Sequence, residues 1–332
     1  MAAKDLMHTS RRSLLKSLLS IAVISASPLI ARANTPWPNR PIKLVVPAPP
    51  GGSLDILART VAKELTTRLN QTVMVENMPG GGSNIAFGYV AKAAPDGYTL
   101  LVGWDSLAIN PALYPSLPYK LDQFAPISLA ITAPQVLVVG TKLPVKNLKT
   151  FIEVARRDPN GLSMANAGNG SPGHLAAALL ESKAEIKFNN IPYKGGAPAV
   201  ADLLAGHVDA LMVTLAAALP HIQSGRLTAL GVSSAKRSTG APTIPTIAEA
   251  GLAGYDLNSW QGFLAPAGTP NEIIRLLNKE IVASLNDPET KKKLIADGFE
   301  VVASSPKVLG EYLASSTPKW AKLVKDSGAK VD

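Results

Sequence analysis

Two glycine- and proline-rich loops carry the residue types best suited to hold a ligand. Each loop follows a strand-like run, 42–46 or 162–166, and each precedes a segment with helical periodicity. Their sequences are Pro47-Ala48-Pro49-Pro50-Gly51-Gly52-Ser53 and Ala167-Gly168-Asn169-Gly170-Ser171-Pro172-Gly173. Unpaired main-chain N–H groups and the helix dipole both favour an anion at a helix N-terminus. The pattern therefore predicts anion binding by two loops that face each other across a cleft.

The candidate binding residues lie in these loops and at the ends of other predicted strands. Glycine lets the backbone approach a ligand without a Cβ atom. The candidates are Ala48, Pro49, Gly51, Gly52, Ser53, Asp55, Trp104, Asp105, Ser106, Gly168, Asn169, Gly170, Ser171, His174 and Thr214. Some have simpler explanations, because Ser53 also suits a helix N-cap and Asp55 a first helical turn. Trp104 and His174 are equally well explained as packing residues.

Short β-type runs alternate with helical segments along most of the chain, which is typical of a parallel sheet flanked by helices. The predicted strands are 42–46, 73–76, 99–102, 136–139, 162–166, 188–191, 210–213 and 229–232. The C-terminal part predicts three helices, beginning near Pro270, Pro288 and Pro306. The fold class predicted is α/β.

Two segments interrupt the alternation and suggest crossings between two domains. One is the proline-rich stretch 111–126, and the other is 256–264. If the chain crosses at both places, the first domain is discontinuous. We expect it to comprise residues 36–133 plus 258–332, and the second domain to comprise 134–257.

The first 33 residues have the features of an export signal. Arg11, Arg12 and Lys16 precede the apolar run 17–30, and Ala31-Arg32-Ala33 fits a small-x-small cleavage site. The apolar run is shorter than the roughly 20 residues that a membrane-spanning helix needs. We therefore predict a signal peptide and an exported protein; Ser10-Arg11-Arg12 also fits a twin-arginine motif, so the export route stays open.

Composition excludes several kinds of chemistry. The chain has no cysteine, so it has no disulfides, thiolate metal sites or thiol nucleophiles. Without residues 1–33 the formal net charge falls from +9 to +5, and the basic residues are scattered, which argues against nucleic-acid binding. The 299 residues left hold three histidines and no His-Glu-x-x-His motif, so we expect no metal.

The glycine loops do not match the known catalytic or cofactor motifs. Gly168-x-Gly170-x-x-Gly173 resembles a dinucleotide loop locally, but Ile191-Pro192 ends the next strand where an acidic residue is required. Asn169-Gly170-Ser171 misses the first glycine of a nucleophile elbow. We therefore expect no cofactor and no enzymatic activity.

An ordered series of short motifs resembles the Bug (TctC-like) family, the substrate-binding proteins of tripartite tricarboxylate transporters. The motifs include Pro36-Trp37-Pro38-Asn39-Arg40-Pro41, the stretch 46–55, Ala94-Pro95-Asp96-Gly97-Tyr98, Pro192-Tyr193-Lys194-Gly195, Leu219-Pro220-His221, and Leu264-Ala265-Pro266-Ala267-Gly268-Thr269-Pro270. They occur in the family's order and cover essentially all of residues 36–332. This resemblance is carried by the whole series rather than by one motif.

The resemblance implies a two-lobed periplasmic binding protein of type II-like architecture, each lobe a sheet flanked by helices, joined by two crossing segments. Such a protein closes on a small organic carboxylate and delivers it to integral-membrane permease subunits. In this family main-chain amides, hydroxyls and ordered waters hold the carboxylate. We expect a monomer. The resemblance leaves open which acid is bound.

Two departures from the family pattern bear on the ligand. Gly103-Trp104-Asp105-Ser106 stands where the family has small residues, and Thr214-Leu215 where it often has Asp-Asn. A gained Trp and a lost acid favour a ligand that is less cationic and more aromatic than an amino acid. Two other functions stay open: a ligand sensor that feeds a two-component system, and, more remotely, an exported hydrolase.

Overall fold

The computed structural model describes residues 36–330. The chain divides at residue 40 into a short first unit, of which residues 36–39 are described and form neither helix nor strand, and a second unit that holds the fold. The predicted signal peptide lies outside the described residues. Everything below concerns the second unit.

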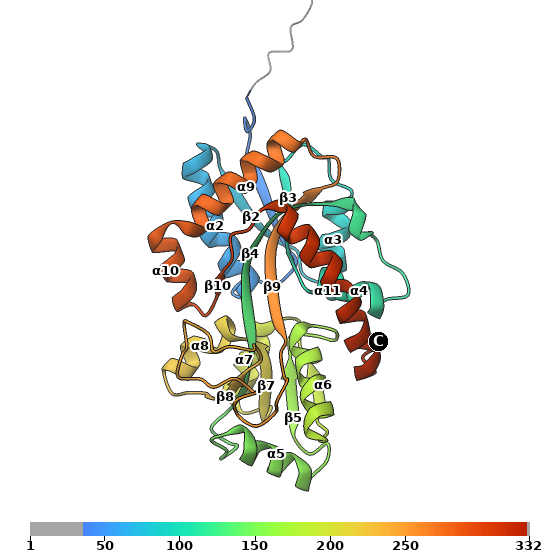
Figure 1. Cartoon of the computed structure of the whole chain (residues 1–332), viewed down its shortest axis with the longest axis vertical. Helices are drawn as coiled ribbons and strands as arrows, with labels where there is room; N and C mark the ends of the chain where they lie inside the picture. The colour runs from blue at the N-terminus through green and yellow to red at the C-terminus, as the bar shows by residue number, and fades with distance from the viewer. Residues whose placement is uncertain (1–35, 331–332) are drawn as a thin grey trace, which may run out of the picture. The chain divides into compact units, whose positions relative to one another are not determined.

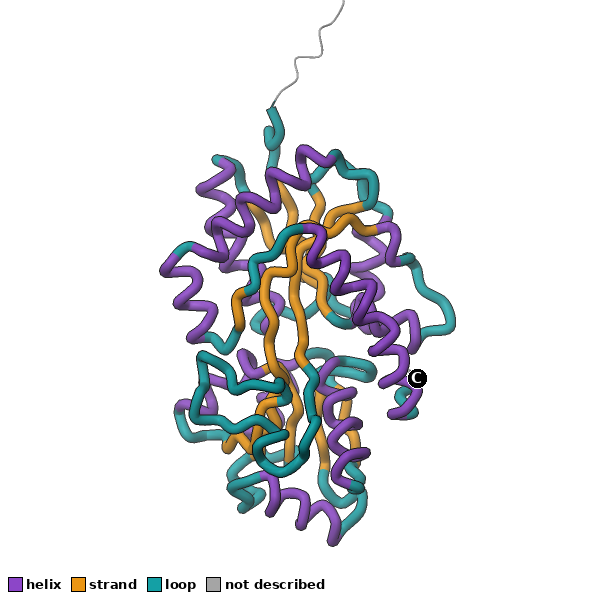
Figure 2. Tube along the Cα trace, in the orientation of Figure 1, coloured by secondary structure: helices purple, strands orange, loops and turns teal. Residues whose placement is uncertain are grey.

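Ten strands form one continuous sheet (Figures 1 and 2). Eight of them follow the order β2-β1-β3-β9-β4-β7-β5-β6, while β8 and β10 pair with β4. Their bounds are β1 Ile42–Val46, β2 Val73–Asn77, β3 Thr99–Trp104, β4 Phe124–Val139, β5 Ser163–Asn166, β6 Asn189–Pro192, β7 Ala210–Thr214, β8 Thr228–Val232, β9 Asn258–Pro266 and β10 Glu300–Val301.

The sheet is mixed rather than parallel, which corrects the sequence-based expectation. Strands β1, β2 and β3 are parallel to one another, and so are β5, β6 and β7. The long strand β4 runs antiparallel to β7, β8, β9 and β10, and β9 runs antiparallel to β3. The reversal arises because β4 and β9 are the segments that cross between the two parallel groups.

The crossing strands make the molecule two-lobed. Figure 1 shows β4 and β9 side by side, in opposite directions, connecting the lobe with β2 and β3 to the lobe with β5 and β7. The register pairs Phe124 with Pro266 at one end and Pro134 with Asn258 at the other. Beyond Pro134, β4 continues into the second lobe, where Gln135 pairs with Thr214 of β7.

Helices cover both lobes. Their bounds are α2 Ser53–Leu69, α3 Asn84–Ala91, α4 Ser106–Leu113, α5 Leu148–Arg157, α6 Pro172–Ala184, α7 Gly196–Ala205, α8 Leu215–Gln223, α9 Asn271–Asn286, α10 Pro288–Ala296 and α11 Pro306–Ser327. On α2, Leu57, Val61 and Leu65 are fully buried, as their i, i+4 spacing predicts. Burial of each such side chain stabilises the fold by about 1.5–3 kcal/mol.

Apolar clusters hold each lobe together. Strands β1 and β3 pack with α3, α4 and Trp260 of β9 in the first lobe, whereas β4, β7 and β5 pack with α7 and α8 in the second. A third cluster joins the lobes, since Ile109 and Leu113 of α4 and Trp320 of α11 belong to the same buried cluster as Leu175 of α6. Among residues 36–330, no helix combines the length and apolar character needed to cross a membrane.

Candidate functional site

A cavity lies between the lobes, where several strands end and helices begin. Its lining residues come from the β1–α2 loop, the ends of β3, β5 and β7, the β6–α7 turn and the first turn of α8. They are Ala48, Pro49, Gly52, Ser53, Leu54, Trp104, Ala167, Gly195, Gly196, Ala197, Val213, Thr214 and Ala217. Both lobes therefore contribute to one site.

Three helices begin at this cavity without a side-chain cap. The N-cap residues are Gly52 for α2, Gly195 for α7 and Thr214 for α8, and none of them caps its helix with a side-chain hydrogen bond. The first N–H groups of a helix have no partner within it. Because these N–H groups and the positive ends of three helix dipoles lie at one cavity, the site favours a negatively charged group.

None of the lining residues is Lys, Arg, His, Asp or Glu. An anion in the cavity would be stabilised by amide and hydroxyl donors and not by a countercharge. Apart from Ser53 and Thr214, the lining side chains are apolar, glycine or the Trp104 ring. The cavity therefore combines amide and hydroxyl donors, which favour an anion, with apolar walls.

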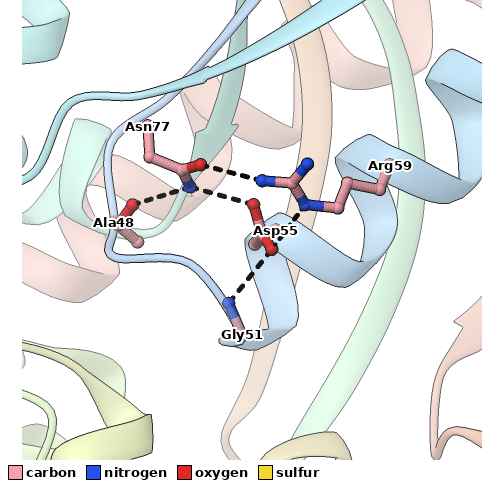
Figure 3. A network of polar contacts seen from close by, with 5 residues as sticks. All are labelled: Ala48, Gly51, Asp55, Arg59 and Asn77. Atoms are coloured by element: carbon pink, nitrogen blue, oxygen red, sulfur yellow. Dashed lines mark hydrogen bonds and ion pairs between the residues drawn. The ribbon is translucent and has the colours of Figure 1, made fainter.

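A polar network braces the first glycine loop (Figure 3). The Asp55 carboxylate accepts hydrogen bonds from Gly51 N–H at 3.0 Å, Arg59 Nε at 2.9 Å and Asn77 Nδ2 at 2.9 Å. Asn77 Nδ2 also donates to the Ala48 carbonyl at 3.1 Å, and Arg59 Nη2 donates to Asn77 Oδ1 at 3.1 Å. Both ends of the turn 48–51 are thus fixed from α2 and β2.

The charge of Asp55 depends on these donors. Burial acts to raise the pKa of the Asp55 carboxyl, but the hydrogen bonds from Arg59, Gly51 and Asn77 outweigh it and leave the pKa below its usual value. Asp55 is 4% exposed and does not line the cavity. Its carboxylate is directed to the loop and to Arg59, so it stays ionised without facing the ligand.

Trp104 presents its ring to the cavity while its N–H group is used elsewhere. The indole Nε1 donates to Ser83 Oγ at 3.1 Å, and Ser83 Oγ donates to the Pro47 carbonyl at 3.0 Å. This relay links the end of β3 to the start of the first glycine loop. Because its polar atom is already paired, Trp104 offers a ligand an aromatic surface and no hydrogen bond.

Asp105 and Ser106 are buried beside the crossing strand and do not line the cavity. The Asp105 carboxylate accepts hydrogen bonds from Ser259 Oγ and, at 3.2 Å, from Trp260 N–H, while its Oδ1 atom has no partner. Burial raises the pKa of Asp105 to about 7 despite these two donors. Asp105 therefore joins the start of α4 to β9.

The second glycine loop satisfies most of its polar groups internally. Asn166 Oδ1 accepts from Gly168 N–H at 2.9 Å, and His174 Nδ1 accepts from Gly170 N–H at 3.0 Å. Ser171 Oγ caps α6 by accepting from His174 N–H at 3.3 Å. Of this loop, only Ala167 lines the cavity.

The predicted binding residues thus separate into two groups. Those that line the cavity are Ala48, Pro49, Gly52, Ser53, Trp104 and Thr214. Those that lie outside its lining are Gly51, Asp55, Asp105, Ser106, Gly168, Asn169, Gly170, Ser171 and His174. Contact with a ligand stays a prediction for both groups.

Sequence reasoning missed the contribution of the β6–α7 turn and of the first turns of α2 and α8. The cavity residues not anticipated are Leu54, Ala167, Gly195, Gly196, Ala197, Val213 and Ala217. A signal was present for the turn, because Gly195-Gly196 follows a predicted strand and precedes a helical segment, as in the first loop. In residues 36–330 no group of three or more His, Cys, Asp or Glu side chains is placed to hold a metal ion.

The lobes touch across the cavity mouth. A Cβ atom on Gly195 would lie 3.2 Å from Cδ of Pro49, so the two turns are in close contact. A Cβ atom on Gly170 would lie 1.9 Å from a methyl group of Leu113 on α4, which places the second glycine loop against the first lobe as well. Two lobes joined by crossing strands, with a cavity between them, are the architecture of the periplasmic binding proteins.

Comparison with known proteins identifies the family. The family described as "Tripartite tricarboxylate transporter family receptor" (TctC) matches residues 57–329. Protein BugT of Bordetella pertussis is 38% identical over 320 residues, which is 96% of this chain and 98% of BugT. The chain belongs to this TctC, or Bug, family of solute-binding proteins.

Solved structures of similar proteins support the same assignment. A protein of R. palustris solved with adipate has a TM-score of 0.86 and 35% identity, with 89% of this chain and 99% of that chain covered. MatC from Rhodopseudomonas palustris, solved with malate, has a TM-score of 0.82 and 32% identity, with 87% and 100% covered. The fold is therefore that of binding proteins seen with small carboxylates.

Proposed function

We propose that this protein captures a small organic carboxylate in the cavity between its lobes and delivers it to the membrane subunits of a tripartite tricarboxylate-type transporter. The observation that carries the proposal is the meeting of three uncapped helix N-termini at a cavity without charged side chains. Adipate and malate in the similar structures support a carboxylate as the ligand class. We assign no catalytic role to the chain.

The donors from both lobes explain how ligand and closure are coupled. Ser53 and the start of α2 belong to the first lobe, whereas the starts of α7 and α8 belong to the second. A ligand shifts a conformational equilibrium only by its differential affinity for the two states. A carboxylate held by both lobes favours the closed form, with β4 and β9 as the hinge between residues 36–133 plus 258–332 and residues 134–257.

The cavity walls favour a ligand with an apolar body. Trp104, Leu54 and Val213 offer apolar surface, and no acidic side chain lines the cavity to pair with an ammonium group. This supports the hypothesis that the ligand is less cationic than an amino acid and packs on the Trp104 ring. A structure with ligand in which Trp104 is remote from it would remove this hypothesis.

The setting proposed for this activity is the periplasm. An N-terminal signal peptide, residues 1–33, would direct export, and the protein released would bind its ligand as a monomer. The family's description as a transporter receptor supports permease subunits as the partners.

A thermal-shift screen of residues 34–332 tests the proposal. The acids are adipate, malate, succinate, citrate, glutamate, benzoate, nicotinate and terephthalate, and matched neutral amides such as succinamide and nicotinamide are the controls. A ligand at a hundred times its dissociation constant stabilises the folded state by about 2.7 kcal/mol. We expect one or more acids, and none of the amides, to raise the melting temperature. No shift with any acid contradicts the proposal.

A further inference from the structure

Gln261 lies on the crossing strand β9 but contacts the first glycine loop. Its side-chain Nε2 donates a hydrogen bond to Ser53 Oγ at 2.9 Å, across 208 positions of sequence. Gln261 is 1% exposed and lies opposite Trp104 of β3 in the strand register. Ser53 is only partly buried and lines the cavity. The hydrogen bond therefore joins the hinge strand to the ligand site.

This bond determines what Ser53 can offer a ligand. A serine hydroxyl has one proton to donate and two lone pairs that accept. The bond from Gln261 uses a lone pair, and within residues 36–330 the Ser53 hydroxyl has no acceptor for its own proton. We propose that Gln261 is a positioning residue that keeps Ser53 a hydrogen-bond donor toward the cavity, so that the site selects a carboxylate oxygen.

The unpaired end of the Gln261 amide supports this role. Within residues 36–330 its Oε1 atom is buried and has no hydrogen-bond partner, so among these residues the amide is hydrogen-bonded only to Ser53. An amide turned the other way would accept the Ser53 proton and leave no donor for the ligand. An anion in the cavity favours the observed direction, because donation from Gln261 to Ser53 and from Ser53 to the anion strengthen each other.

The inference rests on the proposed function, since it assumes a carboxylate beside Ser53. It is tested with adipate, succinate, benzoate and nicotinate as probes, and dissociation constants are measured by titration calorimetry. The variants are Gln261→Met, Ser53→Ala and the double variant. Gln135→Met is the matched control, because Gln135 is also buried on a crossing strand, does not line the cavity, and has no partner for its Nε2 within residues 36–330.

We expect Gln261→Met to weaken binding of the acid by about fivefold when Ser53 is present, and by less than twofold when residue 53 is alanine. One hydrogen bond of about 1 kcal/mol corresponds to that factor. A purely structural role for Gln261 would weaken binding equally on both backgrounds. Gln135→Met should leave the dissociation constant unchanged.

A second variant, Gln261→Glu, tests whether residue 261 must donate the hydrogen bond to Ser53, because its ability to donate depends on pH. In Gln261→Glu the ionised carboxylate accepts the Ser53 proton, so binding of the acid should fall by tenfold or more at pH 8. Burial raises the pKa of a glutamate, and the protonated form donates again. Binding should therefore recover at least partly near pH 5, whereas Gln261→Met should show no such recovery.

The outcomes separate the two proposals. If the wild-type protein binds none of the probes or the other acids of the screen, the proposed function fails and this inference fails with it. If the wild-type protein binds an acid but Gln261→Met acts equally with and without Ser53, only the inference is overturned. Loss of binding by Gln261→Glu that persists at low pH also overturns it.

Discussion

The two glycine loops look equivalent in sequence but differ in whether the first N–H groups of the following helix are capped by a side chain. In the first loop Gly52 is the N-cap of α2 and offers no capping side chain, so the first N–H groups of the helix remain at the cavity. In the second loop Ser171 caps α6 and His174 accepts from Gly170 N–H. We therefore expect the first loop to contact the ligand, whereas the side chains of the second loop cap its own helix.

The difference shows that the N-cap side chain, more than the glycine content, decides whether a helix start can bind an anion. A Ser at the N-cap satisfies one of the donors that an anion would otherwise bind. The functional counterpart of the first loop in the second lobe is Gly195-Gly196, whose N-cap is glycine again. This turn meets Pro49 across the cavity.

The largest expected effect on ligand affinity comes from a substitution at Gly195, which contacts Pro49 of the first glycine loop. Gly195 has φ +126° and ψ 172°, a conformation in which only glycine is comfortable, and its added Cβ would press on Pro49. The strain is present in any state of the lobes, but the contact with Pro49 requires them to be closed. We expect Gly195→Ala to weaken binding of the acid found in the screen by about tenfold or more, equivalent to about 1.4 kcal/mol, by calorimetry.

Gly251→Ala is the matched control. Gly251 has φ +122° and nothing within 4 Å of an added Cβ, so this variant carries backbone strain without a contact between the lobes. It should lose stability and keep its affinity. Equal affinities of Gly195→Ala and Gly251→Ala for the acid would show that the turn 195–196 has no role in closure.

A pair of serine variants separates the two loops directly. Ser171→Ala removes the cap of α6 and should lower the free energy of unfolding by about 1 kcal/mol with affinity unchanged. Ser53→Ala removes no cap, since Gly52 is the N-cap, and should lower affinity by about fivefold. It also leaves the buried Gln261 Nε2 without its acceptor, so the free energy of unfolding should fall by about 1–3 kcal/mol. Urea denaturation and titration calorimetry measure the two quantities. Similar effects of both variants on affinity would restore the second loop as a ligand contact.

The fold was largely predictable because local patterns determine most of it. Strand β1 and the three C-terminal helices follow the expected bounds closely, since alternation and helical periodicity are strong there. The expectation for β4 was too short, 136–139 against Phe124–Val139. Prolines at 126 and 134 obscured a strand whose pairing is long-range, with β9 more than a hundred residues away.

The lining of the cavity was predicted for the first loop and, at the ends of two strands, for Trp104 and Thr214. Ala48, Pro49, Gly52 and Ser53 follow from the local pattern of strand, glycine and helix. Gln261 does not, because its bond to Ser53 exists only after β9 has paired with β3. The internal pairing of the second loop was not predicted either, since the side chains of Asn166 and His174 accept from Gly168 and Gly170 N–H only once the loop has its folded conformation.

Because the ionised Asp55 carboxylate braces the first loop, we expect the free energy of unfolding to depend on pH in the acidic range. The pKa of Asp55 is lowered on folding, so its contribution to stability is complete above the unfolded value of about 3.8 and is lost as the pH falls through the lower folded value. Asp55→Asn keeps a side-chain acceptor but loses the ion pair with Arg59, whose side chain is 55% exposed. We expect a loss of about 0.5–1 kcal/mol at pH 7.

That loss should shrink between pH 7 and about pH 3, because below the unfolded value of about 3.8 the unfolded chain takes up a proton on Asp55 before the folded protein does. Urea denaturation of both proteins at the two pH values measures it, and Asp326→Asn, in an exposed ion pair on α11, is the control. A difference between wild type and Asp55→Asn that is independent of pH would show that the charge of Asp55 does not brace the loop.

The contribution of the second glycine loop to stability should decline at a higher pH than that of the first loop, and by a smaller free energy. Burial lowers the pKa of His174, whose neutral Nδ1 accepts the Gly170 N–H. The neutral side chain contributes stability that is complete above about pH 6.5 and declines as the pH falls toward the lower folded value. Between pH 7 and pH 5.5 we expect the free energy of unfolding to fall by about 0.3 kcal/mol. This loss should be absent in His174→Asn, because asparagine keeps an acceptor but does not titrate. Asp105, beside the cavity residue Trp104, also titrates in this range with a pKa of about 7, so affinity is compared between wild type and His174→Asn at both pH values. The two proteins should show the same change in affinity, and a loss confined to wild type would mean that the second loop also holds the ligand.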